Sequence, residues 1–245
     1  MLLLLLALTS VLGWFVSIIV GGGSSLILMP IVGIFLGAQA IPPIITIGGI
    51  FGNAERIYVY WSNVNWKILK WEIPAAVVGA LLGAFTLSKL DLEWLTIIVA
   101  AFLIISAISS FLKKNEQSFT VKMWYFIPGG FIHAFLSGLI GSMGPILAPF
   151  YINYGLKKEE LLATQAIDRL VVHCIKLIAY GVFGMLQLPY IGYGLVIGLA
   201  SFPGNWLGGL VLEKISERLF RQLVFSFVMF SGFFIFWEHR QVVGF

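Results

Sequence analysis

The sequence is short of charged residues and contains a single cysteine. Only 11% of its 245 residues are Asp, Glu, Lys or Arg, against about 25% in an ordinary soluble domain. Because so few polar side chains cannot cover the outside of a fold in water, a soluble globular protein is excluded. Cys174 is the only cysteine, which excludes an intrachain disulfide and a zinc site made of several cysteines. A hydrophobic share of 60% also excludes intrinsic disorder.

Signatures of enzymes and of nucleic-acid binding are missing as well. The chain has no H-E-x-x-H, no G-x-S-x-G and no Walker A motif, and its 3 histidines are scattered. We therefore expect no enzyme activity, no metal and no cofactor. No basic tract is interleaved with aromatic residues, so nucleic acid is not expected as a partner. The composition instead predicts a polytopic helical protein whose main partner is the lipid bilayer.

The apolar residues fall into segments of membrane-spanning length. Six of them can each cross a hydrocarbon core of about 30 Å as one helix. They are residues 42–61, 68–87, 94–111, 161–185, 188–212 and 219–237. Two further stretches, 2–36 and 124–154, are too long for one span, and each has a glycine-containing break, at 21–24 and at 141–145. Residues 2–20 are predicted to stay as a first membrane segment rather than to be cleaved as a signal peptide.

The second half of the chain repeats the first. Residues 79–90 align with 204–215, and both read G-x-x-L-G-small-x-x-L-x-K-aliphatic, at an offset of 125. Pro30 aligns with Pro149 at an offset of 119. The same order, a broken stretch followed by three spans, occurs twice.

The boundaries of the repeats follow from this order. Thr46 aligns with Thr164 at an offset of 118, so the register holds with a small insertion. We predict a first repeat at 1–111, a cytoplasmic linker at 112–123 and a second repeat at 124–245, all within one membrane domain.

The lysines and arginines predict the topology. If each broken stretch is a hairpin, ten of these residues fall on one side and two on the other, as the positive-inside rule expects. The two are Lys89 and Arg240. The ten are Lys67, Lys70, Lys113, Lys114, Lys122, Lys157, Lys158, Lys214, Arg218 and Arg221. The repeats would then be inverted, with both termini outside and the linker in the cytoplasm.

The two breaks are the first candidate site. Gly22, Gly23, Ser24 and Ser25 lie at the first break, and Ser142 and Gly144 lie at the second. Non-helical backbone at membrane depth is tolerated only within protein or beside a water-filled cavity. A helix that restarts there points free N–H groups at the cavity, which favours an anion. The alternative is a pair of kinks that let helices pack closely.

Segment 161–185 carries the second candidate, a polar stripe on an apolar helix. Gln165, Arg169, His173, Lys176 and Tyr180 are spaced four, four, three and four residues apart. Lipid cannot accept such a face, so it must point into the bundle or a cavity. The stripe is either a cationic path for an anion or an internal network of paired charges.

Two residues that flank this stripe, Asp168 and Thr164, are also candidates. Asp168 and His173 are candidates for proton coupling. Thr164 and its repeat partner Thr46 could bind an oxyanion or hydrogen-bond to their own helix backbone.

Segment 42–61 contributes the last candidates. Asn53 lies three residues before Arg56, so the two share a helical face. Arg56 either faces the substrate or extends to the cytoplasmic surface, because it is near that end of the segment.

These motifs resemble a known family. The resemblance rests on G-G-G-S-S-L-I-L-M-P at 21–30 with I-T-I-G-G at 45–49, and on G-S-M-G-P-I-L-A-P at 141–149 with T-Q-A at 164–166. Together with the repeated G-x-x-L-G motif, they look like the TauE/SafE sulfite exporter family. That resemblance implies a small multipass protein with two homologous halves that moves sulfite, thiosulfate, sulfoacetate or similar anions. The second break has fewer consecutive glycines than is usual, and Ile47 stands where the family often has serine.

The sequence thus predicts a secondary transporter of a small, sulfur-containing anion in the cytoplasmic (inner) membrane, working by alternating access of two inverted repeats. A passive anion channel and a non-transporting membrane scaffold are the alternatives. Whether the chain forms a homodimer is left open. The predicted substrate-binding residues are Gly22, Gly23, Ser24, Ser25, Thr46, Asn53, Arg56, Ser142, Gly144, Thr164, Gln165, Arg169 and Lys176.

Overall fold

A computed structural model describes residues 1–89, 120–143 and 146–238 of the chain. Every regular element in these ranges is a helix, which confirms the predicted all-helical fold. The predicted span at 94–111, residues 112–119 of the linker and the candidate Gly144 lie outside the described residues.

The helices follow the predicted segments closely. The α-helices of the described residues are α1 (Leu2–Ile19), α2 (Ser24–Leu36), α3 (Ile41–Tyr60), α4 (Trp66–Leu87), α6 (Phe126–Ile140), α7 (Ala148–Tyr154), α8 (Lys158–Val182), α9 (Leu188–Leu212) and α10 (Glu217–Glu238). Short 3₁₀ turns connect some of them, at η1 (Ala38–Ala40), η2 (Trp61–Asn63) and η3 (Met123–Tyr125).

Both long apolar stretches are interrupted at their glycines. Gly21, Gly22 and Gly23 all have positive φ angles, of 73°, 135° and 99°, which side chains with a Cβ rarely adopt. Gly141 ends α6 with a φ of 94°. The 18 residues of α1 extend roughly 27 Å, whereas the 13 residues of α2 extend only roughly 20 Å. The first hairpin therefore pairs a helix of spanning length with a shorter one.

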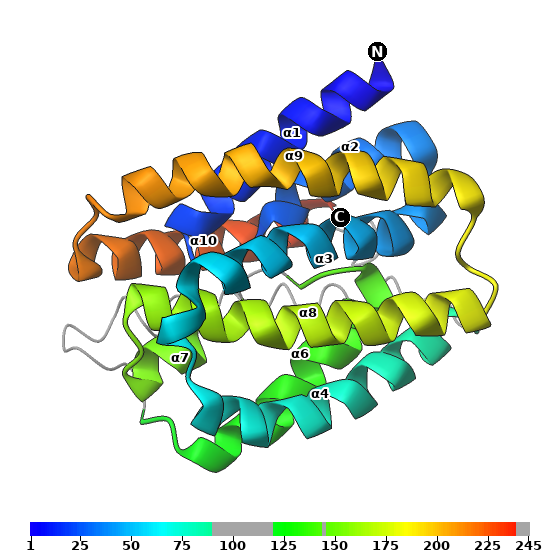
Figure 1. The fold of residues 1–245 in the computed structure, drawn as a ribbon. Helices are drawn as coiled ribbons and strands as arrows, with labels where there is room; N and C mark the ends of the chain where they lie inside the picture. Colours follow the sequence, from blue (N-terminus) through cyan, green and yellow to red (C-terminus); the bar gives the residue numbers. More distant parts are fainter. Residues whose placement is uncertain (90–119, 144–145, 239–245) are drawn as a thin grey trace.

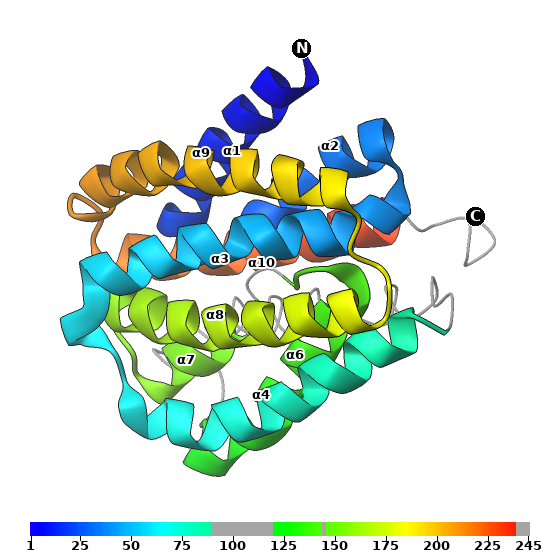
Figure 2. The same cartoon turned by 45° about the vertical axis from the view of Figure 1, so that its right-hand side comes forward.

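Two polar helices form the centre of the bundle. α3 packs against α8; α9 and then α1 lie beyond α3, and α4 and then α6 lie beyond α8 (Figures 1 and 2). The central position explains the composition of α3 and α8, since neighbouring helices shield their polar residues from lipid. Four described helices are long and apolar enough to cross a membrane: Leu2–Ile19, Trp66–Leu87, Met123–Ile140 and Leu188–Leu212.

Glycines bring the outer pairs of helices into close contact. A Cβ added at Gly83 would lie 2.1 Å from the backbone oxygen of Phe135 on α6. A Cβ at Gly204 would lie 2.4 Å from the backbone oxygen of Val11 on α1. The repeated G-x-x-L-G motif therefore serves helix packing, α4 on α6 and α9 on α1.

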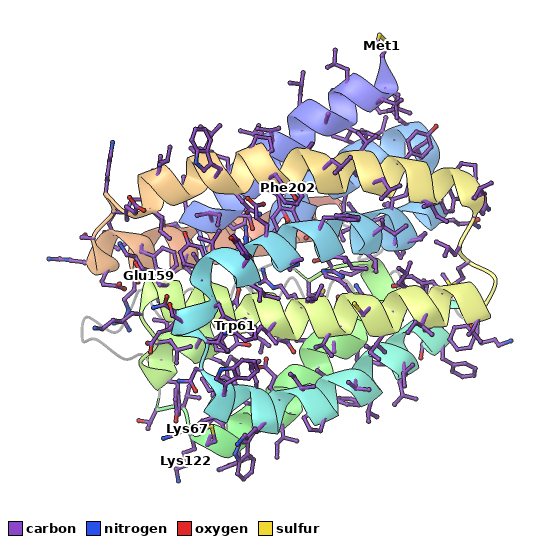
Figure 3. All side chains as sticks on the ribbon, in the orientation of Figure 1. Met1, Trp61, Lys67, Lys122, Glu159 and Phe202 are labelled. Carbon is purple, nitrogen blue, oxygen red and sulfur yellow. The ribbon has the colours of Figure 1, made fainter. Side chains whose placement is uncertain are left out.

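The two ends of the bundle differ in charge. Lys67 and Lys122 lie at one end, near Trp61 and Glu159, and Met1 lies at the other (Figure 3). Between the ends the surface is apolar, with exposed side chains such as Leu8, Leu82 and Trp206. Such a belt is what a lipid environment requires.

Candidate functional site

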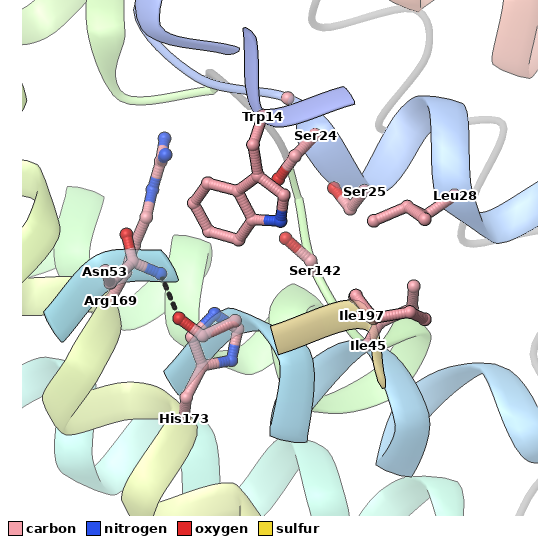
Figure 4. A pocket seen from close by; sticks show the side chains of 12 residues that line it. Trp14, Ser24, Ser25, Leu28, Ile45, Asn53, Ser142, Arg169, His173 and Ile197 are labelled. Atoms are coloured by element: carbon pink, nitrogen blue, oxygen red, sulfur yellow. Dashed lines mark hydrogen bonds between the residues drawn. The ribbon is translucent and has the colours of Figure 1, made fainter. Parts of the chain in front are cut away.

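A pocket opens inside the bundle at the first break. It is lined by residues of both halves of the chain. These are Trp14, Gly23, Ser24, Ser25, Leu28, Ile45, Gly49, Asn53, Ser142, Arg169, His173 and Ile197. Figure 4 shows Trp14, Ser24, Ser25 and Ser142 together on one side, with Asn53 and His173 across from them. Among the described residues, the lining contains no carboxylate.

The start of α2 forms one wall of the pocket. Gly23 is the N-cap, and Ser24 and Ser25 are the first helical residues. The first N–H groups of an α-helix have no partner within the helix, and the helix dipole adds positive potential there. The hydroxyl of Ser25 is buried and has no hydrogen-bond partner among the described residues. Both features favour an anion at this place.

The indole of Trp14 reaches the pocket because α3 has a glycine opposite it. A Cβ at Gly52 would lie 2.4 Å from the Trp14 ring. The other face of the indole contacts Arg56, whose guanidinium carbon lies 4.8 Å from the ring centroid. The indole N–H is buried without a hydrogen-bond partner among the described residues. An indole N–H can only donate, so this group suits an oxyanion.

Arg169 brings a cation to the same pocket. Its guanidinium lies against the backbone of the first break, since a Cβ added at Gly22 would be 2.6 Å from Nη2 of Arg169. Gly22 does not itself line the pocket, but its missing side chain makes room for Arg169. Arg169 also interacts electrostatically with Asp168, Glu72 and Tyr151, none of which lines the pocket. The cation is therefore shared by the pocket and a group of acidic side chains.

The polar stripe of α8 faces the interior, as its pattern predicts. Gln165, His173, Lys176 and Tyr180 are all buried, whereas Cys174 on the opposite face is exposed. His173 packs against α3 at Gly49, where an added Cβ would lie 2.6 Å from Nε2. The imidazole thereby lines the pocket, and its Nδ1 has no hydrogen-bond partner in the described part of the chain.

Asn53 completes the polar lining from α3. Its side-chain amide donates to the backbone oxygen of Gly49 at 2.7 Å, one turn earlier (Figure 4). Leu28, Ile45 and Ile197 supply the apolar part of the wall. The pocket thus combines donors and one cation with an apolar surface that excludes water from part of it.

Three predicted site residues are bound by the protein itself, away from the pocket. Arg56 donates from Nε to Oδ1 of Asn205 at 3.0 Å. The Thr164 hydroxyl accepts from the backbone N–H of Asn65 at 3.0 Å, before the start of α4. The third, Lys176, donates to oxygens of both Ser137 and Gly141.

Lys176 binds the end of the helix that precedes the second break. Its ammonium donates to the Ser137 hydroxyl at 2.9 Å and to the backbone oxygen of Gly141. A cation at the C-terminal end of a helix is favoured by the dipole and by the free carbonyls there. The structure therefore places Lys176 as a cap on α6.

Two more predicted residues are buried outside the pocket. The hydroxyl of Thr46 and both polar atoms of the Gln165 amide have no hydrogen-bond partner among the described residues. Neither residue lines the pocket.

Sequence reasoning missed several residues of this region. Trp14 and Ile197 have no local signal of a site, because one reads as an interfacial aromatic and the other as a core aliphatic. Gly49 and Gly52 lie on one helical face with Gly48, and such a face indicates close approach of other side chains. Glu72 was also overlooked, although an acidic residue within an apolar span is itself a functional signal.

Glu72 belongs to a second polar cluster beside the pocket. Tyr151 donates to the carboxylate of Glu72, with oxygen–oxygen distances of 2.6 and 2.7 Å. Nδ1 of His133 lies 3.4 Å from Oδ2 of Asp168. All four side chains are buried. In the ranges that the structure describes, no three His, Cys, Asp or Glu side chains are arranged to hold a metal ion.

Comparison with known proteins gives one match. The sequence model of the family described as "Sulfite exporter TauE/SafE" matches residues 5–235, nearly the whole chain. No curated protein and no solved structure matches the chain.

Proposed function

Because this chain belongs to the TauE/SafE sulfite exporter family, we propose that it is a secondary transporter that moves sulfite, thiosulfate or a small organosulfonate across the cytoplasmic membrane. Family membership already indicates a membrane transporter of sulfur-containing anions rather than an enzyme. The proposal adds the binding site, the kind of substrate and the mechanism.

One observation carries the proposal: the pocket contains buried donors that have nothing to bind. Trp14 Nε1 and Ser25 Oγ both lack a partner among the described residues, although burying such a group unpaired costs roughly 1–3 kcal/mol. A bound oxyanion would remove that cost. The start of α2 and Arg169 would add positive potential, and the part of the lining that the structure describes holds no carboxylate that would repel an anion.

The apolar wall fits a sulfur-containing anion. Sulfite, thiosulfate and sulfonates have oxygens at one end and a lone pair, a sulfur or a short carbon chain at the other. The donors of Trp14 and Ser25 would bind the oxygens, and Leu28, Ile45 and Ile197 would contact the less polar part. Asn53, Ser24 and Ser142 would complete the site.

Alternating access is supported by the way that the halves pack. α4 of the first half pairs with α6 of the second, and α9 of the second pairs with α1 of the first. α1 and α6, which begin the two halves, run in opposite directions (Figure 1). This reciprocity is expected of inverted repeats. Because both halves line the pocket, a rocking motion between them would open it to one side at a time.

The same arrangement supports the proposed sidedness. Lys67 and Lys122 lie at the end that we assign to the cytoplasm, opposite Met1 (Figure 3). A cysteine introduced at Lys122 should be labelled by an impermeant reagent only after the cells are opened.

The test is uptake of radiolabelled thiosulfate into proteoliposomes by wild type, Trp14→Phe and Ser25→Ala. Each variant removes one donor but little volume. A hydrogen bond to a charged group contributes about 1.5–3 kcal/mol, so KM should rise about 10- to 100-fold. Trp206→Phe is the matched control, because Trp206 is 65% exposed on the outer surface. It should leave KM unchanged.

Each outcome decides between the hypotheses. Saturable flux with counterflow and a raised KM in both pocket variants supports the transporter and its site. Flux that does not saturate and follows voltage would indicate a channel instead. Absence of flux for thiosulfate, and for sulfite and sulfoacetate assayed in the same way, from folded protein, would favour a scaffold. A KM unchanged by Trp14→Phe and Ser25→Ala would refute the binding site.

A further inference from the structure

The charges inside the described part of the bundle are balanced. The fully buried ones are Arg56 and Lys176, and Glu72 and Asp168. Away from the end turns of α3 and α8, each sign is joined by one half-buried side chain, Arg169 and Glu55. With His133 and His173 neutral, these charges sum to zero. An anion that enters the pocket upsets this balance, and an uncompensated buried charge is costly.

The carboxyl groups that could restore the balance lie in one cluster. Glu72 on α4 faces Tyr151 on α7, and Asp168 on α8 faces His133 on α6. The two carboxylates also interact electrostatically with each other. A proton added to either would be shared among groups that already hydrogen-bond or lie within ion-pair distance.

Two atoms of the cluster have no hydrogen-bond partner among the described residues. They are Oδ1 of Asp168 and Nδ1 of His133. Both residues are at least 95% buried. Because a buried acceptor without a donor is unfavourable, these atoms are chemically suited to take up a proton.

Arg169 connects this cluster to the pocket. It lines the pocket and interacts with Asp168, Glu72 and Tyr151. An anion bound to the guanidinium would weaken the stabilisation that Arg169 gives to both carboxylates. Proton binding would therefore become more favourable when the anion is bound, and by linkage the proton would strengthen anion binding by the same factor.

The repeat supports the idea that this cluster has a distinct function. At the offset of 119 that aligns Pro30 with Pro149, Trp14 corresponds to His133. At the offset of 125 that aligns residues 79–90 with 204–215, Glu72 corresponds to Ile197. Thus two pocket residues, Trp14 and Ile197, have ionisable counterparts in the cluster. The positions equivalent to these two pocket residues are therefore filled by titratable groups.

We propose that the anion moves together with one proton, and that this proton is bound by the cluster of Glu72, Tyr151, Asp168 and His133. The inference rests on the proposed transport function. The proton comes from water on one side, adds to a carboxylate oxygen and leaves to water on the other side. Glu72 on α4 interacts with Tyr151 on α7 and with Asp168 and Arg169 on α8. His133 on α6 interacts with Asp168, Arg169, His173 and Lys176, all on α8.

The experiment uses the full chain in proteoliposomes with thiosulfate as the probe, because thiosulfate does not itself bind protons near neutral pH, whereas sulfite does. Valinomycin and equal potassium hold the membrane potential at zero, and the outside is made more acidic than the inside. With one proton per anion, a difference of about one pH unit should concentrate thiosulfate about tenfold inside. A dye in the lumen should report acidification during uptake.

Glu72→Gln and Asp168→Asn test the assignment to the cluster. Each removes one proton-binding carboxylate and keeps the shape of the side chain. We expect both variants to retain thiosulfate counterflow, which also shows that they are folded, but to lose the tenfold accumulation. Glu213→Gln is the matched control, because Glu213 is exposed beyond the end of α9, and it should accumulate thiosulfate like wild type.

Tyr151→Phe gives a readout that a purely structural role would not change. It removes the donor that stabilises the ionised Glu72 carboxylate, so the pH profile of uptake should move to higher pH by about one unit or more. This variant and Asp168→Asn decide the question if Glu72→Gln shows no counterflow.

The failures are distinguishable. If wild type shows no saturable flux, the proposed function fails. If wild type shows saturable flux but no accumulation under the pH gradient, proton coupling is wrong and the transporter stands. If the carboxyl variants still accumulate thiosulfate tenfold, the proton binds elsewhere and the assignment to this cluster is overturned.

Discussion

Gly22→Ala isolates the role of Arg169 at the first break. The substitution has two effects that can be calculated separately. The φ angle of Gly22 is 135°, so any side chain strains the backbone there, at a cost of roughly 1–2 kcal/mol. In addition, the new Cβ would lie 2.6 Å from Nη2 of Arg169, and the guanidinium must withdraw by roughly 1 Å to reach ordinary contact.

A second glycine separates the two effects. Gly155 has a φ of 108°, and a Cβ there would meet nothing within 4 Å. Gly155→Ala therefore carries the backbone strain alone. Both variants should lower the melting temperature in detergent by roughly 2–8 °C. Only Gly22→Ala should displace Arg169 and weaken a charge-assisted contact to the anion, which would raise the KM for thiosulfate about tenfold or more.

The assay is thiosulfate uptake into proteoliposomes beside thermal unfolding of the same preparations. A raised KM in Gly22→Ala, with a wild-type KM in Gly155→Ala, is the expected pattern. A wild-type KM in both variants would refute the reasoning, because the displacement of Arg169 would then have no effect on the anion. Equal rises in both would show that backbone strain at any turn disturbs transport.

Three further predictions concern structural contacts. Lys176→Met leaves the acceptors at the end of α6 unpaired and should lower the free energy of unfolding by about 1–3 kcal/mol, whereas Lys176→Arg should cost less; equal stability of wild type and Lys176→Met would contradict the capping role. Thr164→Val removes the acceptor for the Asn65 N–H, so it should lower stability by about 1 kcal/mol and leave the KM for thiosulfate unchanged, which a substrate-binding threonine would not do. Gly83→Val should prevent close packing of α4 on α6 and abolish a monodisperse peak in size-exclusion chromatography. The control Gly192→Val should keep that peak, because a Cβ at Gly192 would meet nothing within 4 Å.

Features that depend on neighbouring residues could be predicted from the sequence. Hydropathy over about 20 residues sets a span, and the ends of α9 agree with the predicted 188–212. The break at Gly21–Gly23 follows from three consecutive glycines, which adopt the positive φ angles that other residues avoid. The inward orientation of the α8 stripe follows from its helical spacing. All of these are local patterns.

Features that depend on distant partners could not be predicted. Lys176 lies on the same stripe as Arg169, so the pattern predicts the same role for both, yet one caps α6 and the other lines the pocket. The Glu72–Tyr151 contact joins residues 79 positions apart on two helices. Trp14 becomes a pocket residue only because α3 has a glycine where the indole crosses it. Such pairings depend on the rotation of each helix against its neighbours, which hydropathy does not determine.

The division between local and distant features has a consequence for specificity. The glycine break is a local motif, and it supplies backbone N–H groups and the start of α2, which suit any small anion. The groups that distinguish anions come from other helices: Trp14 from α1, Arg169 and His173 from α8, and Ile197 from α9. Changes at these positions can alter the preferred anion without disturbing the break. Substrate differences among chains that share the break should therefore correlate with the residues at these four positions rather than with the number of glycines.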